Sequence, residues 1–73
     1  MKTRQFVVCI DNSGYPASLE IRKIYEQLPD VVAENQNQVR IVDESGEDYL
    51  YPASSFVRIQ LPKDAERAII RAA

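Results

Sequence analysis

The chain has no histidine, no tryptophan and only one cysteine among its 73 residues. Without histidine, neither a Ser-His-Asp triad nor a histidine-bound metal can form. A single cysteine cannot form an intramolecular disulfide, which favours a reducing compartment. Cys9 lies in an apolar run with no cation beside it, so we expect a buried, unreactive thiol. We therefore expect a protein that is not an enzyme and that uses no cofactor.

Long apolar runs and an excess of basic residues are also absent. The run FVVCI at residues 6–10 is too short for a signal-peptide core or a membrane span. Nine Lys and Arg residues are scattered among eleven Asp and Glu residues, giving a net charge of −2. A polyanion requires a concentrated basic surface, which this sequence does not provide. We expect a cytoplasmic protein without membrane contact, for which nucleic acid is a disfavoured partner.

Seventy-three residues are enough for one small domain. A chain of this length buries only about 60% of the surface that its unfolded form exposes. So small a core leaves little room for a catalytic cleft, and oligomerisation often stabilises domains of this size. The run at residues 6–10 is apolar at every position, which predicts a strand that is buried on both sides or lines a small barrel.

The best-defined element is a hairpin at residues 39–52. A two-residue turn centred on Ser45 and Gly46 predicts a register that pairs Ile41 with Leu50, and a four-residue acidic loop predicts the same one. One face is then expected in the core: Val39, Ile41 and Leu50. The other face is expected to carry a cation among aromatic rings: Arg40, Val42, Tyr49 and Tyr51.

This second face is the candidate binding surface, formed by Arg40, Tyr49 and Tyr51. Tyrosine supplies a large amphipathic contact area at low entropic cost. The alternative is that the rings cover the outside of the domain or pack beneath the first loop and the terminal helix. A single-strand nucleic-acid platform would need basic residues beside the rings, and Glu47 and Asp48 offset the local positive charge. We expect a protein partner or a second copy of the chain.

Four carboxylates lie within the six residues 43–48. Ca²⁺ takes six to eight oxygen ligands, but this spacing does not match a calcium-binding loop. A solvated turn that discourages aggregation of strand edges accounts for the charge. No metal site is expected.

Residues 18–28 allow two interpretations. Ile21, Ile24, Tyr25 and Leu28 follow the i, i+3, i+4, i+7 spacing of a helix, and Ser18 is a suitable N-cap. Alternatively, a loop ends at Arg22 and a strand follows, for which tyrosine is a favourable residue. Periodicity alone favours the helix.

The end of the chain is easier to interpret. Pro52 cannot donate to a ladder, so a 3₁₀ turn is expected at residues 53–55, before a strand at residues 56–61. Pro62 suits the first turn of a terminal helix. That helix is expected to have a narrow apolar stripe: Ala65, Ala68, Ile69 and Ala72.

The segments KIYEQLPD and VRIVDESGEDYLYPASSFVRIQL carry a resemblance to known proteins. The order of strand, hairpin, 3₁₀ turn and closing strand resembles a five-stranded SH3-like barrel. More narrowly, the segments are similar to a family of small uncharacterised bacterial proteins that share a VDESGEDYLYP-type stretch. The resemblance implies a strand at residues 23–28 and a long loop at residues 11–22, but no activity.

The resemblance also implies the division of the chain. One domain is expected over residues 1–73, with the barrel at about 4–61 and the C-terminal helix at about 62–72. The chain differs from eukaryotic signalling SH3 domains, because it lacks their ALYDY-type motif and the tryptophan of their proline-binding groove. Recognition of PxxP peptides is therefore not expected.

Overall fold

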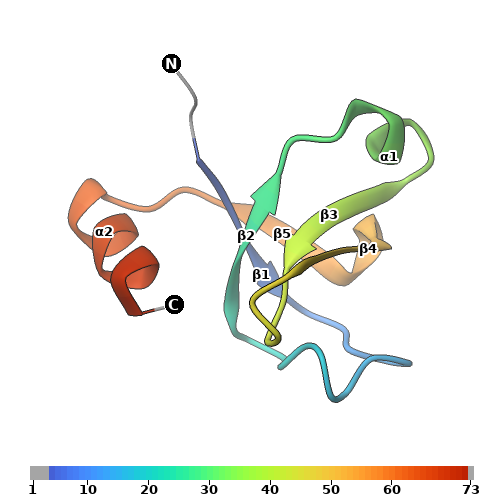
Figure 1. The fold of residues 1–73 in the computed structure, drawn as a ribbon, viewed down its shortest axis with the longest axis horizontal. Helices are drawn as coiled ribbons and strands as arrows, with labels where there is room; N and C mark the ends of the chain where they lie inside the picture. Colours follow the sequence, from blue (N-terminus) through green and yellow to red (C-terminus); the bar gives the residue numbers. More distant parts are fainter. Residues whose placement is uncertain (1–3, 73) are drawn as a thin grey trace.

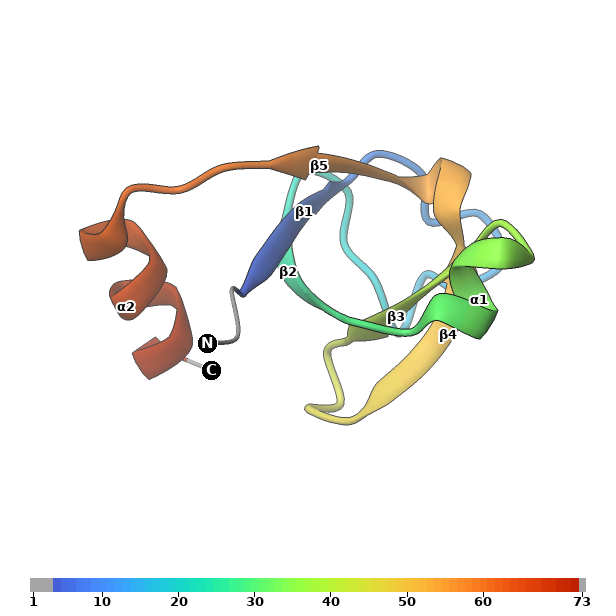
Figure 2. The same ribbon diagram turned by 90° about the horizontal axis from the view of Figure 1, so that it is seen from above.

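A computed structural model describes residues 4–72 of the chain. Its strands are all antiparallel and form one sheet in the order β4-β3-β2-β1-β5. The strands are β1 (Gln5–Cys9), β2 (Ile24–Leu28), β3 (Gln38–Val42), β4 (Asp48–Pro52) and β5 (Phe56–Ile59). The sheet curls around a core without a ladder between β4 and β5 in residues 4–72 (Figures 1 and 2). The prediction of a mainly β chain with five strands is confirmed.

The core lies inside the curl of the sheet. Val7 and Cys9 of β1 face inward, and Cys9 is fully buried, as expected for this thiol. Phe6 points to the other side of the same strand, yet it is also buried. The prediction that residues 6–10 are buried on both sides therefore holds at Phe6 and Val7, whereas Val8 is half-buried and Ile10 lies beyond the strand and is 51% exposed. The inner cluster consists of Val7, Cys9, Leu19, Tyr25, Val39, Ile41, Tyr51 and Phe56.

Residues 24–28 form strand β2, so the helix that periodicity favoured is wrong. Burial alternates along the strand, with Tyr25 and Gln27 inside and their neighbours half-buried. Ile21, which completed the helical pattern, lies in the preceding loop and is 50% exposed. The strand that the resemblance implied is the observed one.

The hairpin of β3 and β4 has a different register from the one predicted. Its loop has three residues: Asp43 N–H donates to the Glu47 carbonyl (3.0 Å) and Gly46 N–H to the Asp43 carbonyl (3.0 Å). Gly46 has φ +84°, the left-handed conformation that follows a type I turn in such loops. The loop is closed one residue earlier on the second strand than predicted, so the register moves by one position.

This shift exchanges the two faces of β4. Ile41 pairs with Tyr49 instead of Leu50, and Val39 pairs with Tyr51. Tyr51 is consequently buried in the core, whereas Leu50 is 39% exposed on the outside. The prediction that Ile41 and Leu50 are core neighbours is wrong, because a slip of one residue turns every side chain to the opposite face.

A single helical turn, α1 (Val31–Asn35), interrupts the polar segment between β2 and β3. Asp30 caps it: its side chain accepts a hydrogen bond from the Ala33 N–H (3.0 Å). The 3₁₀ turn η1 (Ala53–Ser55) lies where Pro52 ends the ladder, which confirms that prediction.

The terminal helix α2 (Lys63–Ala72) is present and lies to one side of the sheet (Figures 1 and 2). Strand β5 ends at Ile59, two residues before the predicted end. The half-buried residues of α2 are Ala65, Glu66, Ile69 and Ile70. The expected apolar stripe is therefore rotated, because Ala68 and Ala72 are exposed.

Candidate functional site

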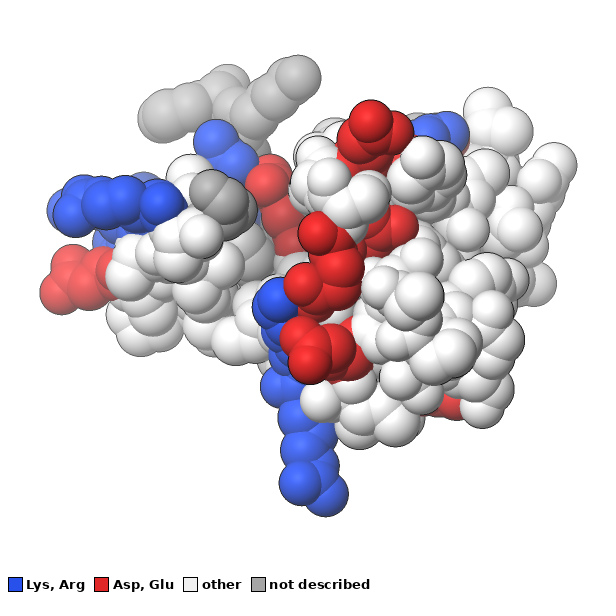
Figure 3. Space-filling model, turned by 60° about the horizontal axis from the view of Figure 1, so that its bottom comes forward, with Lys and Arg blue, Asp and Glu red and all other residues white. Residues whose placement is uncertain are grey.

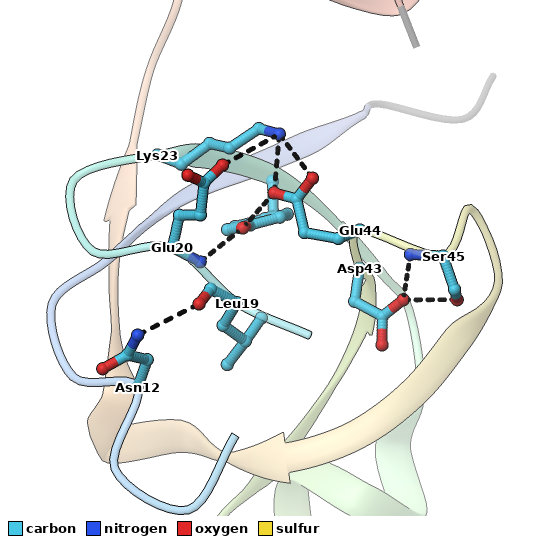
Figure 4. A network of polar contacts seen from close by, with 8 residues as sticks. Asn12, Leu19, Glu20, Lys23, Asp43, Glu44 and Ser45 are labelled. Carbon is cyan, nitrogen blue, oxygen red and sulfur yellow. Dashed lines mark hydrogen bonds and ion pairs between the residues drawn. The ribbon is translucent and has the colours of Figure 1, made fainter. Parts of the chain in front are cut away.

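The long loop between β1 and β2, residues 10–23, forms one wall of the candidate site. Its anchor is Leu19, which is fully buried and points into the space that the strands enclose (Figure 4). Backbone bonds fix both ends of the loop: Ile10 N–H donates to the Ser55 carbonyl (2.8 Å) and Arg22 N–H to the Cys9 carbonyl (2.7 Å). The loop is thus a packed part of the fold.

A polar network joins this loop to the hairpin turn (Figure 4). The Tyr25 hydroxyl accepts a hydrogen bond from the Glu20 N–H (2.7 Å) and donates to Glu44 Oε2 (2.5 Å). Lys23 Nζ lies 2.6 Å from the same carboxylate oxygen. The Glu44 N–H donates to the Ser18 carbonyl (3.1 Å), so main chain and side chains both tie the turn to the loop.

The network changes the pKa values of Tyr25 and Glu44 in opposite directions. Burial, reinforced by the hydrogen bond to Glu44, raises the pKa of the Tyr25 hydroxyl well above its ordinary value. Hydrogen bonds from Lys23 and Tyr25 lower the pKa of Glu44, and they outweigh the opposing effect of burial. At neutral pH the contact therefore consists of a neutral tyrosine and an ionised glutamate.

The lowered pKa of Glu44 predicts an acid-sensitive attachment of the loop. Because the folded-state pKa lies below the unfolded one, the stabilisation is complete above the unfolded value of about 4.3 and is lost as pH falls through the folded value. Glu44→Gln is expected to lower the free energy of unfolding by about 1 kcal/mol at pH 7. Between pH 6 and pH 3, the free energy of unfolding of this variant is expected to fall less than that of the natural chain. Urea unfolding across this range, with Glu47→Gln as the control from the same turn, measures the difference. Equal pH dependence in Glu44→Gln and the natural chain would contradict the assignment.

Between the loop and the hairpin lies a hollow of about 410 Å³, which we call the tyrosine groove. Tyr15 and Tyr49 stand at its rim, 39% and 50% exposed, and Tyr51 is buried at its base. The rings of Tyr15 and Tyr51 meet edge to face, with centroids 5.0 Å apart. The groove is lined by Tyr15, Ser18, Asp43, Ser45, Tyr49, Leu50 and Tyr51.

Asp43 supplies the charge of the tyrosine groove, and it is only 7% exposed. Its Oδ1 accepts hydrogen bonds from Ser45 N–H (2.9 Å) and Ser45 Oγ–H (2.6 Å), and its Oδ2 accepts one from the Tyr51 hydroxyl (2.5 Å). Burial acts to raise the pKa of Asp43, but these three donors together lower it below its usual value. Burial, reinforced by Asp43, also raises the pKa of Tyr51 to about 12. Asp43 is therefore an ionised carboxylate.

The structure brings together two of the three residues predicted to bind. Tyr49 and Tyr51 both line the tyrosine groove, but Arg40 lies on the opposite face of the hairpin. There its guanidinium contacts Asp30 (2.9 Å) and Asp48 (3.2 Å). The predicted combination of a cation with these two rings does not exist.

Five residues that line the groove were not among those predicted to bind: Tyr15, Ser18, Asp43, Ser45 and Leu50. Tyr15 and Ser18 come from the long loop, and no local pattern indicates that this loop folds back over the hairpin. The position of Asp43 could have been predicted from the sequence, because Asp at the first position of a type I turn with Gly at the fourth is a favoured pair. That pair also predicts the observed three-residue loop.

The surface around the groove is acidic. Residues 4–62 contain nine Asp and Glu residues against five Lys and Arg residues, a net charge of −4. Figure 3 brings forward the side of the molecule on which the long loop and the hairpin turn lie. Acidic side chains form a band across it, and Lys or Arg side chains lie beside the lower part of this band. Lys23 lies in this region, and its charge is already paired with Glu20 and Glu44.

A second, smaller hollow of about 270 Å³ lies near α1. Gln27, which is 4% exposed, and Arg58 contribute to its lining, as do Glu34 and Asn37. Within residues 4–72, no three His, Cys, Asp or Glu side chains gather closely enough to hold a metal ion. None of the helices described in this part of the chain has the length and apolar character needed to cross a bilayer.

Comparisons with models of known families, with curated proteins and with solved structures find no match to this chain.

Proposed function

We propose that this chain is a non-catalytic protein-interaction module that binds an extended segment of a partner protein in the tyrosine groove. The observation that carries the proposal is the pair of half-exposed rings, Tyr15 and Tyr49, on either side of a hollow with a fixed base. Aromatic side chains in a defined hollow are typical of the residues that dominate binding energy at protein interfaces.

The rigid support of the groove favours binding. The buried side chain of Leu19 anchors the loop in the core. Glu44 connects the loop to the hairpin turn through its contacts with Tyr25 and Lys23. A surface that is already ordered loses little conformational entropy when a partner docks. Both walls of the tyrosine groove therefore support recognition without a large rearrangement.

We further propose that the curled sheet is an SH3-like barrel. The order β4-β3-β2-β1-β5, the long loop after β1 and the 3₁₀ turn between β4 and β5 support this assignment. The sheet has edges at β4 and β5, so a second copy of the chain is a further possible partner.

Site-specific photo-crosslinking in cells tests the proposal. A benzophenone amino acid replacing Tyr49 is expected to capture a protein, whereas the same group replacing Val57, which is 49% exposed on β5, is expected not to. An adduct of twice the chain's mass would identify a second copy as the partner. Adducts that disappear after nuclease treatment would replace the proposal by nucleic-acid binding, and an absence of adducts at position 49 would refute it.

A further inference from the structure

We infer that the tyrosine groove holds a cationic side chain, a lysine or an arginine of the bound segment, between Tyr15 and Tyr49 and above the Asp43 carboxylate. This inference rests on the proposed function and specifies the chemistry of the partner. It depends on three observations: a buried charge, exposed aromatic rings and a repeated arrangement within the chain.

The buried charge is Asp43. Within residues 4–72, no Lys or Arg nitrogen lies within 4 Å of its carboxylate, although five other pairs of opposite charge are made. Its hydrogen-bond donors are the neutral groups of Ser45 and Tyr51. Buried carboxylates are normally paired with a cation, and within the described residues Asp43 is not. Asp43 borders a hollow, so a cation can reach it from outside the chain.

The rings supply the second attraction. The face of a tyrosine ring carries partial negative charge and attracts an ammonium or guanidinium group within about 6 Å. Tyr49 donates its hydroxyl to Glu47 (3.0 Å) and Tyr51 donates to Asp43, and both bonds increase the electron density of the rings. Tyr15 and Tyr49 also offer apolar surface to the methylene groups of a long side chain.

The same arrangement occurs elsewhere in the chain with its cation in place. Tyr25 donates its hydroxyl to Glu44, and Lys23 Nζ lies beside this carboxylate and 5.6 Å from the centre of the Tyr25 ring. Tyr51 and Asp43 repeat the pair of hydroxyl and carboxylate in the groove, but no lysine of residues 4–72 pairs with the Asp43 carboxylate. The acidic band on this side of the molecule would attract a basic segment and repel an acidic one (Figure 3).

The test uses the full chain and four blocked peptides of sequence Gly-Gly-X-Gly-Gly, in which X is lysine, arginine, norleucine or glutamate. Affinities are measured by NMR titration at low ionic strength. The lysine and arginine peptides are expected to bind at least about tenfold more tightly than the norleucine peptide, which has a similar apolar stem without charge. The glutamate peptide is expected to bind most weakly.

Two variants locate the effect. Asp43→Asn is expected to reduce the affinity for the lysine peptide at least about fivefold and to leave the norleucine peptide unchanged. Tyr15→Leu lies outside the hairpin turn, so it removes a ring from the groove without altering the loop that Asp43 forms, and it is expected to weaken lysine binding similarly. Glu34→Gln removes one negative charge beside the second hollow and is expected to change nothing.

The outcomes separate the two proposals. If the norleucine peptide binds as tightly as the lysine peptide, the groove is an apolar site and the inference is wrong, while the proposed function stands. If no peptide binds but crosslinks form at position 49, the inference is again wrong. If Glu34→Gln weakens binding as much as Asp43→Asn does, general electrostatics accounts for the effect and Asp43 has no special role. Failure of the crosslinking itself refutes the proposed function.

Discussion

Leu19→Ala is expected to lower the free energy of unfolding by about 2–5 kcal/mol, the cost of emptying a leucine-sized volume in a core. Leu19 is fully buried although it belongs to a loop, and it contacts the cluster at the centre of the sheet. In a domain of 73 residues this loss is a large part of the total stability. The loop that forms one wall of the tyrosine groove would lose its anchor at the same time.

Ile21→Ala is the matched control, because Ile21 lies in the same loop and is 50% exposed. We expect it to cost less than about 1 kcal/mol. Urea unfolding followed by circular dichroism measures both variants. Similar, small losses in the two would mean that the loop is not packed into the core.

Ile41→Ala is expected to destabilise the chain by about 2–5 kcal/mol, whereas Leu50→Ala is expected to cost about 1 kcal/mol or less. The reason is the register of the hairpin: Ile41 is fully buried, and Leu50 is 39% exposed on the outer face. The comparison is sensitive, because a shift of β4 by one residue would turn Leu50 into the core beside Ile41 and make the two losses similar.

The same unfolding experiment measures this pair of variants. A loss for Leu50→Ala as large as that for Ile41→Ala would support the register derived from a two-residue turn at Ser45 and Gly46. It would also move Tyr51 out of the core and destroy the base of the tyrosine groove.

Much of the architecture was predictable from local chemistry. Residues 39–52 contain two β-forming runs separated by turn residues, so a hairpin follows whatever its loop length. Pro52 ends the ladder and leaves a 3₁₀ turn, and Pro62 with the acidic residues after it begins a terminal helix. Each of these features depends on neighbouring residues only.

The register could not be predicted so simply, because loops of two, three and four residues all suit the turn chemistry of residues 43–48. The choice depends on the Asp43 side chain, which accepts hydrogen bonds from Ser45 and favours a type I turn. Periodicity failed at residues 18–28 for another reason. Apolar residues of the loop and of β2 fell by chance at helical spacing, and pairing with β1 and β3 decided the outcome.

The candidate site was only half predictable. Tyr49 and Tyr51 share one face of a strand by simple alternation, so their proximity followed from the sequence. Tyr15 reaches them only because Leu19 draws the long loop over the hairpin, which is a tertiary effect. Arg40 was placed with the rings because the register was one residue off.

The place where a basic segment contacts the chain decides whether the tyrosine groove is the binding site. The most direct test is the map of amide chemical-shift changes when the lysine peptide is added to the ¹⁵N-labelled full chain. We expect the largest changes at Tyr15, Ser18, Ser45 and Tyr49, around the tyrosine groove. Changes concentrated at Gln27 and Arg58, in the second hollow, would contradict it.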